Sequence, residues 1–180
     1  MSAFFLIIKE RQKDMTEKEF IEYIGSKATI DYQQSGILAS ITIAQACLES
    51  GYGTTDLAKN ANNLFGMKTI LSGNTWKSAW DGKSKYTKRT KEEYRPGVIT
   101  TITADFRKYP SIDKSIEDHS LYLSQAKNGS KLRYSGLVGE KNYKTAIQII
   151  KNGGYATDNS YVQKICSLIE RWNLPKYDIK

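Results

Sequence analysis

One apolar segment with helical spacing, residues 35–49, constrains the fold of this chain more than any other feature. Its side chains Ile37, Ile41, Ala44 and Leu48 recur at spacings of four, three and four, which is the repeat of one helix face. Further apolar residues between them widen this stripe. We therefore expect a helix that is buried on most of its sides.

Length and composition favour one folded domain. The chain has 180 residues, of which 39% are hydrophobic and 26% charged, so it can bury enough apolar surface to offset its chain entropy. We assign residues 15–175 to this domain, 1–14 to an N-terminal extension and 176–180 to a C-terminal tail. No apolar run reaches the roughly 20 residues that cross a bilayer, and the start of the chain has no basic segment before its apolar run. We expect neither a transmembrane segment nor a secretory signal peptide.

The order of helical and strand patterns predicts an α+β domain. Apolar spacing and capping residues indicate helices over residues 14–28, 35–49, 55–62, 143–151, and from about 111 and about 160 onward. Residues 66–109 alternate β-branched or aromatic residues with polar ones and predict a small antiparallel sheet, with 98–106 as its clearest strand. A cleft is expected where this sheet meets the helical body.

One carboxylate has surroundings that point to catalysis. Glu49 ends the apolar helix, and Gly51 and Gly53 follow it in a stretch that stops the helix. Burial beside Leu48 would disfavour the charged form, and a carboxyl that keeps its proton near neutral pH can act as a general acid. The pattern alone leaves open the alternative of a solvated carboxylate at a helix end.

Residues 39–68 form a long and specific stretch that reads ASITIAQACLESGYGTTDLAKNANNLFGMK. This stretch resembles the signature of glycoside hydrolase family 73, the bacterial β-N-acetylglucosaminidases of peptidoglycan. The likeness continues through TKEEYRPG (90–97), FRKYPS (106–111), residues 115–119 and GYATDNSY (154–161). It implies a lysozyme-like α+β fold, in which a helical body and a small antiparallel β-lobe enclose a substrate cleft.

The resemblance also implies the catalytic residues, position by position. Glu49 matches the residue that donates a proton to the glycosidic oxygen. Glu93, in TKEEYRPG, matches a second carboxylate that relatives carry on a β-hairpin, and the adjacent Glu92 stays open as an alternative. Tyr155, in the GYATD string, matches an aromatic residue of the active site.

Four further residues are expected to contact sugars. Asn63 and Phe65 belong to the NNLFGMK segment, which lines the cleft in relatives. Tyr52 neighbours Glu49 in the sequence, and Trp80 falls in the sheet region, where an indole ring can stack on the apolar face of a sugar. For Trp80, a place in a small aromatic core is the alternative.

The implied reaction is hydrolysis of the β-1,4 bond between N-acetylglucosamine and N-acetylmuramic acid in peptidoglycan. Such cleavage needs one carboxyl that gives a proton and a second that stabilises the oxocarbenium-like centre or activates water. Basic neighbours in the sequence would keep Glu93 ionised. Whether Glu93 or the acetamido group of the substrate assists stays open. The alternatives are a lytic transglycosylase of the same fold and a wall-binding module without catalysis.

Charge and cysteine content restrict the partners. The net charge of +8 favours an anionic polymer, so we expect peptidoglycan strands and anionic wall polymers, with the protein monomeric and at the cell wall or outside the cell. No zinc-finger spacing or RNA-recognition motif supports nucleic acid. Two cysteines and one histidine give no metal-ligand spacing, so we expect no metal or other cofactor. A thiol nucleophile, Cys47 or Cys166 paired with His119, is the remaining rival.

Overall fold

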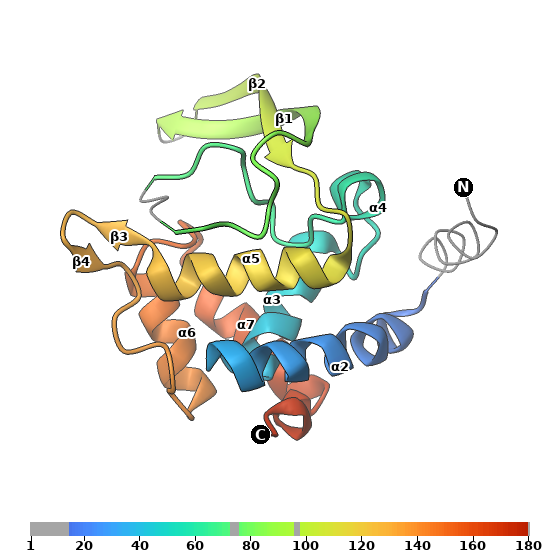
Figure 1. Cartoon of the computed structure of the whole chain (residues 1–180), viewed down its shortest axis with the longest axis vertical. Coiled ribbons are helices and arrows are strands. Elements are labelled where there is room, and N and C mark those ends of the chain that lie inside the picture. Colours follow the sequence, from blue (N-terminus) through green and yellow to red (C-terminus); the bar gives the residue numbers. More distant parts are fainter. Residues whose placement is uncertain (1–14, 73–75, 96–97, 180) are drawn as a thin grey trace.

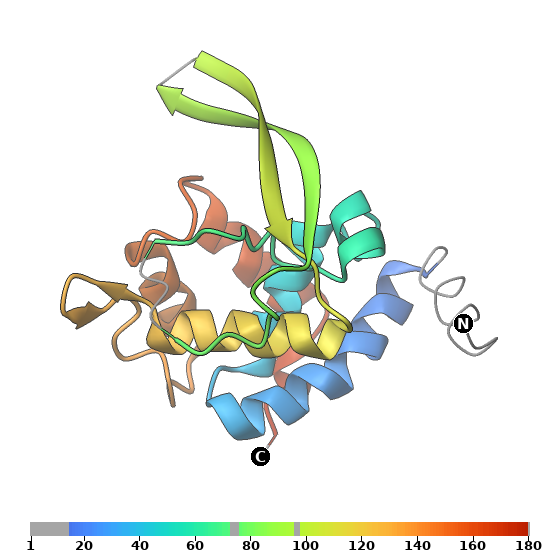
Figure 2. The same cartoon turned by 45° about the horizontal axis from the view of Figure 1, so that its top comes forward.

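A computed structural model describes residues 15–72, 76–95 and 98–179, without the side chains of residues 90–99. The helices are α2 (Glu17–Ser35), α3 (Ala39–Ser50), α4 (Asp56–Ala61), α5 (Ile112–Gln125), α6 (Tyr143–Asn152), α7 (Tyr161–Arg171) and the short 3-10 helix η1 (Leu174–Tyr177). The strands are β1 (Lys85–Arg95), β2 (Val98–Arg107), β3 (Lys127–Asn128) and β4 (Lys131–Leu132). The predicted α+β class is confirmed, because the helices form one body from which the β1–β2 hairpin projects (Figures 1 and 2).

Helix α3 lies at the centre of the helical body, as its apolar pattern predicts. Its side chains from Ala39 to Cys47 are all buried, and α2, α7 and η1 pack around it. The helix begins at Ala39, four residues later than predicted, because Ser35 is the last residue of α2. Gly36 separates the two helices by taking the left-handed conformation, with φ of 74°. None of the helices in the described part of the chain has the length and hydropathy to cross a bilayer.

Helix α2 is longer than the predicted helix over 14–28. Thr16 begins it through a reciprocal capping box with Glu19, and the helix continues through Gly25 to Ser35. Gly25 does not end the helix because it serves close packing instead. A Cβ atom at this position would clash with the ring of Tyr177 in η1.

The predicted sheet over residues 66–109 is correct only for its second half. Strands β1 and β2 pair antiparallel from Lys85 opposite Arg107 to Arg95 opposite Val98. The loop that precedes them, from residue 66 to residue 84, forms a single isolated bridge in its described part, between Lys68 and Phe106. Thr69 and Met67 bond to the backbone of β2, whereas Ser78 and Ala79 bond to α5, so the loop joins the hairpin to the helical body instead of forming a strand of its own.

A buried ion pair fastens the hairpin and the loop before it to α5. The guanidinium of Arg107, at the end of β2, lies 2.7 Å from the Asp118 carboxylate on α5, and both side chains are fully buried. Asp118 also accepts hydrogen bonds from the Tyr109 hydroxyl, the Ser78 hydroxyl and the Ala79 amide. Burial alone would raise the pKa of Asp118, but the hydrogen bonds outweigh it and lower the pKa, so the carboxylate stays charged.

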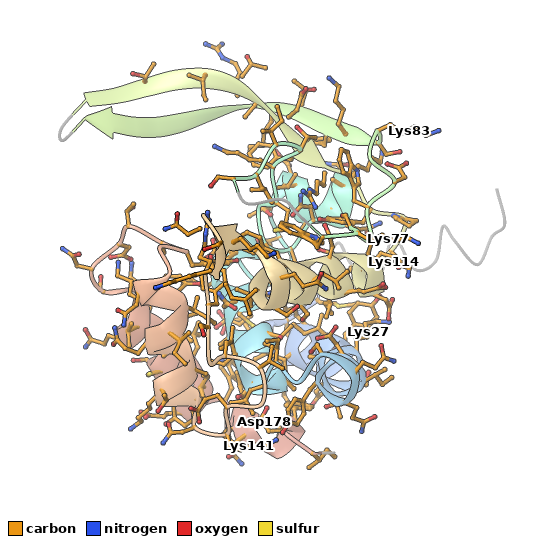
Figure 3. All side chains as sticks on the ribbon, turned by 60° about the vertical axis from the view of Figure 1, so that its left-hand side comes forward. Lys27, Lys77, Lys83, Lys114, Lys141 and Asp178 are labelled. Carbon is orange, nitrogen blue, oxygen red and sulfur yellow. The ribbon has the colours of Figure 1, made fainter. Side chains whose placement is uncertain are left out.

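The end of the chain packs against the core. Residues 176–178, expected to belong to a tail, complete η1 and its cap. The Asp178 carboxylate accepts a hydrogen bond of 2.8 Å from the Ser40 amide and so caps α3, whose own N-cap residue, Leu38, has no side-chain acceptor. Asp178 lies beside Lys141 at the end of the body away from the hairpin (Figure 3).

We expect Asp118→Asn to destabilise the protein by about 3–5 kcal/mol, because the buried Arg107 guanidinium loses its counter-charge. Urea unfolding followed by circular dichroism measures this change. Glu117→Gln is the matched control, since Glu117 belongs to an exposed pair with Lys114 on the same helix and its loss should change stability by less than about 1 kcal/mol. Equal effects of the two substitutions would contradict the anchoring role of Asp118.

Candidate active site

A cavity of about 500 Å³ lies where the end of α3 meets the start of α7 and two connecting loops. The residues that line it are Leu48, Glu49, Phe65, Gly66, Met67, Leu71, Tyr122, Tyr155, Ala156, Thr157, Asp158, Tyr161 and Lys164. Apolar and aromatic walls with a few polar groups are typical of a ligand-binding cavity. Three of the sequence-predicted site residues, Glu49, Phe65 and Tyr155, meet here.

Glu49 lies in the last turn of α3 and is exposed toward the cavity. The packed protein around its carboxyl withdraws water from it, and this desolvation raises the pKa of Glu49 above its ordinary value. The Tyr161 hydroxyl donates a hydrogen bond of 3.3 Å to Oε1 of Glu49, which acts in the opposite direction but is the weaker effect. Glu49 thus has the environment of a general acid.

Two residues that hold Glu49 escaped the sequence prediction. Tyr161 is the last residue of the GYATDNSY string, and it is buried at the start of α7. Gln45 is fully buried on α3, and its side-chain amide donates a hydrogen bond of 2.8 Å to the Tyr161 hydroxyl. The sequence contained one indication of the role of Gln45: it precedes Glu49 by four residues, so both lie on the same face of the helix.

Tyr155 is half-buried in the cavity wall and contacts His119. Its hydroxyl lies 3.1 Å from Nε2 of His119, whose ring stacks on Phe65 with centroids 3.8 Å apart. Burial raises the pKa of Tyr155 well above its usual range, and nearby Tyr161 and Glu49 add to this. Burial also lowers the pKa of His119 to about 3, so a neutral imidazole meets a protonated phenol.

The remaining expected sugar contacts lie outside the residues that line this cavity. Asn63 is buried, and its side-chain amide binds backbone groups of Met67 and Arg107. The Tyr52 hydroxyl accepts a hydrogen bond from the Trp172 indole. Trp80 lines a different cavity of about 290 Å³ at the base of the hairpin, where its ring lies over the Arg107 guanidinium.

Glu93 and Glu92 belong to β1, on the outer half of the hairpin. Glu93 pairs with Ile99 and Glu92 with Thr100 across the two strands. Their side chains lie outside the part of the chain that the structure describes.

The cysteines do not have the surroundings of nucleophiles. Cys47 is buried in α3, and desolvation raises the pKa of its thiol to about 12. Cys166, on α7, is half-buried rather than in the core, and its pKa is also raised by desolvation. Neither lines the cavity that contains Glu49. The geometry therefore gives the thiol rival no support.

Comparison of the sequence with family models and with characterised proteins identifies relatives of this chain. The family model for glucosaminidases, described as mannosyl-glycoprotein endo-beta-N-acetylglucosaminidase, matches residues 25–174. The exo-glucosaminidase LytG of Bacillus subtilis (strain 168) is 36% identical over 172 residues, which are 96% of this chain and 57% of that protein. The peptidoglycan hydrolase FlgJ of Salmonella typhimurium is 28% identical over 158 residues, 86% of this chain and 46% of that one. The chain thus spans about half the length of these curated relatives.

Solved structures have the same architecture. The crystal structure of the catalytic domain of the autolysin Auto from Listeria monocytogenes superimposes with a TM-score of 0.76 at 31% identity, covering 99% of this chain and 98% of that one. A C-terminally truncated glycoside hydrolase domain of Salmonella typhimurium FlgJ gives a TM-score of 0.65 at 26% identity, covering 88% and 98%. These likenesses confirm the lysozyme-like fold that the sequence predicted.

We expect the buried imidazole of His119 to make stability pH-dependent. Its pKa is about 3 in the folded protein and near 6.5 when unfolded, so only the unfolded chain gains a proton between these values. The contribution of the neutral His119 to the free energy of unfolding is therefore fully present above pH 6.5. It decreases as the pH falls below this value, by up to about 1.4 kcal/mol per pH unit.

Urea unfolding from pH 5 to 8 tests this, with His119→Gln for comparison. The wild type should lose more stability on acidification than the variant, whatever their difference at pH 8. Asp31, whose pKa burial raises to about 6, titrates in both proteins and cancels in the comparison. Parallel pH profiles would contradict a neutral, buried His119.

Proposed function

This chain belongs to the glucosaminidase family of glycoside hydrolases, and from this membership we propose that it hydrolyses the β-1,4 bond between N-acetylglucosamine and N-acetylmuramic acid in bacterial peptidoglycan. The observation that carries the proposal is Glu49, a carboxyl with a raised pKa at the wall of a cavity of about 500 Å³. The names of the relatives, a peptidoglycan hydrolase and a glucosaminidase among them, support the substrate.

In this proposal Glu49 is the general acid. It gives its proton to the bridging oxygen as the bond from that oxygen to C1 of N-acetylglucosamine breaks, so that the leaving sugar departs as an alcohol. The carboxyl is then a carboxylate, and the developing positive charge lies on the sugar ring. Water adds to C1, and one of its protons restores the acid. The raised pKa supports this role because only the protonated form can donate.

Glu93 is the proposed second carboxylate. Its support is the match of TKEEYRPG to the family signature and its place on the β1–β2 hairpin, in a stretch of the sequence rich in Lys and Arg. In the ionised form it would stabilise the oxocarbenium-like centre or activate water.

Tyr155 and Phe65 are the proposed contacts that orient the sugar. Both line the cavity with Glu49, and each is fixed by His119, Tyr155 through its hydroxyl and Phe65 through ring stacking. A fixed aromatic wall suits the apolar face of a sugar ring. Tyr52, Asn63 and Trp80 lie outside the lining of this cavity, and their proposal as sugar contacts rests on the sequence.

The proposed action is endo, at the cell wall or outside the cell, by a monomer. The family description names an endo-acting enzyme, whereas the Bacillus relative is named an exo-glucosaminidase. The size distribution of released fragments separates endo from exo action, since exo action releases only terminal units.

The net charge of +8 supports additional attraction to anionic wall polymers.

We expect Glu49→Gln to lower the release of wall fragments by at least about a thousandfold, because the amide cannot donate the proton. Mass spectrometry of the reduced digest identifies the bond: reduced N-acetylglucosamine ends indicate the proposed hydrolysis, whereas anhydro-muramic ends indicate a transglycosylase. The control is Glu170→Gln, an exposed carboxylate of α7 that binds Tyr143 away from the cavity. Digestion by Glu49→Gln at the wild-type rate would remove Glu49 from the reaction.

We expect Glu93→Gln to lower kcat by about a hundredfold or more while chitooligosaccharide affinity changes little, because charge on the sugar develops only in the transition state. Steady-state kinetics and isothermal titration calorimetry give the two quantities. Glu92→Gln is the paired control and should have the smaller effect on kcat. A Glu93→Gln variant that binds weakly but turns over normally when saturated would contradict this role.

A further inference from the structure

A glutamine in the middle of the core is the least expected polar residue of the helical body. Gln45 is fully buried on α3 among apolar neighbours. Its Nε2 donates to the Tyr161 hydroxyl at 2.8 Å, while its Oε1 has no hydrogen-bond partner among the described residues. A buried carbonyl without a partner lowers stability, so an apolar residue would be the more stable choice at this position.

The Tyr161 hydroxyl connects Gln45 to Glu49. A phenolic hydroxyl has one proton to donate and lone pairs to accept with. The Nε2 amino group of Gln45 can only donate, so it occupies a lone pair of the hydroxyl and leaves the hydroxyl proton for Oε1 of Glu49, 3.3 Å away. The chain of donors therefore runs in one direction, from Gln45 through Tyr161 to Glu49.

This direction determines which carboxyl oxygen is free to hold the proton. Oε1 of Glu49 is engaged as an acceptor, so the proton of the neutral carboxyl belongs on Oε2. We propose that Gln45 and Tyr161 are positioning residues, which keep Oε1 as the acceptor and so leave Oε2 as the oxygen that carries the proton to the substrate. This inference rests on the proposed role of Glu49 as general acid.

The opposite orientation of the Gln45 amide shows why direction matters. A carbonyl facing Tyr161 would take the hydroxyl proton, and Oε1 of Glu49 would then have to donate to the phenol. The acidic proton would point away from the substrate. In the observed direction, the Oε2–H bond of Glu49 breaks and the bridging oxygen gains the proton as its bond to C1 breaks. The Tyr161 hydroxyl then stabilises the new carboxylate.

No other charged group competes for Glu49 among the described residues of the cavity. Lys164 on α7 is paired with Asp158 at 2.7 Å, and neither forms an ion pair with Glu49. The Tyr122 hydroxyl shares a hydrogen bond with Tyr134, and the Tyr155 hydroxyl contacts His119. The Tyr161 hydroxyl is thus the group through which the protein acts on the Glu49 proton.

A carbon-13 NMR titration of the glutamate carboxyls tests the contact between Tyr161 and Glu49, with Glu49→Gln to assign the signal. In Tyr161→Phe the titration midpoint of Glu49 should move to higher pH, because the hydrogen bond favours the ionised form. Tyr134→Phe is the control, since it removes a buried hydroxyl that does not contact Glu49, and it should leave the midpoint unchanged. A midpoint unaffected by Tyr161→Phe overturns the proposal.

Kinetics on peptidoglycan fragments test the positioning role itself. We expect Tyr161→Phe to lower kcat about tenfold and to move the alkaline limb of its pH profile upward. Gln45→Met, which keeps the volume, should lower kcat by several-fold with little change in KM. Thr42→Val is its control, because Thr42 is equally buried on α3 and its hydroxyl has no described partner, so its removal should leave the alkaline limb in place.

The double variant distinguishes positioning from general damage to the core. If Gln45 acts through Tyr161, Gln45→Met has no further effect on kcat in the Tyr161→Phe background. Independent, multiplicative losses overturn the proposal. A different result would refute the proposed function alone: the wild type does not cleave peptidoglycan, but Tyr161→Phe still shifts the titration midpoint of Glu49. The failure of the proposed function and the failure of this inference are therefore distinguishable.

Discussion

The buried pair between Arg107 and Asp118 is the interaction on which the arrangement of the site depends. A buried charge without its partner is strongly unfavourable, so the end of β2, the Ser78 segment and α5 are held in one relative position. His119 follows Asp118 on α5 and contacts the hydroxyl of Tyr155. The helical turn that anchors the hairpin therefore also orders the wall of the cavity.

Asp118 and Glu49 show how one fold lowers the pKa of one carboxyl and raises that of another. Burial disfavours the charged form of both. Asp118 receives hydrogen bonds from Arg107, Tyr109 and further donors, and these outweigh burial. Glu49 receives one long hydrogen bond, from Tyr161, so desolvation prevails. The number of hydrogen-bond donors, rather than the depth of burial, therefore explains why the pKa of Asp118 is lowered and that of Glu49 is raised.

The helices of the body could largely be predicted, because each contributes an apolar face of regular period and a capping residue such as Thr55 or Ser111. The errors have a common cause. The first helix was predicted to end at residue 28, yet α2 continues to Ser35, and Gly25 inside it makes room for Tyr177. The loop over 66–84 was predicted to form strands, yet Ser78 and Ala79 bind Asp118 and Thr69 bonds to the backbone of β2. Both depend on partners distant in the sequence, which a local pattern does not contain.

The place of Glu49 at the end of an apolar helix follows from the residue pattern alone, and so does the match to the glucosaminidase signature. Periodicity and motif are local properties, so they can be read without coordinates. The hydrogen bonds of Tyr161 with Glu49 and with Gln45, and the binding of Asn63 to backbone groups away from the cavity, became visible in the folded chain. Hydrogen-bond direction and desolvation arise between segments, so folding has to bring those segments together first.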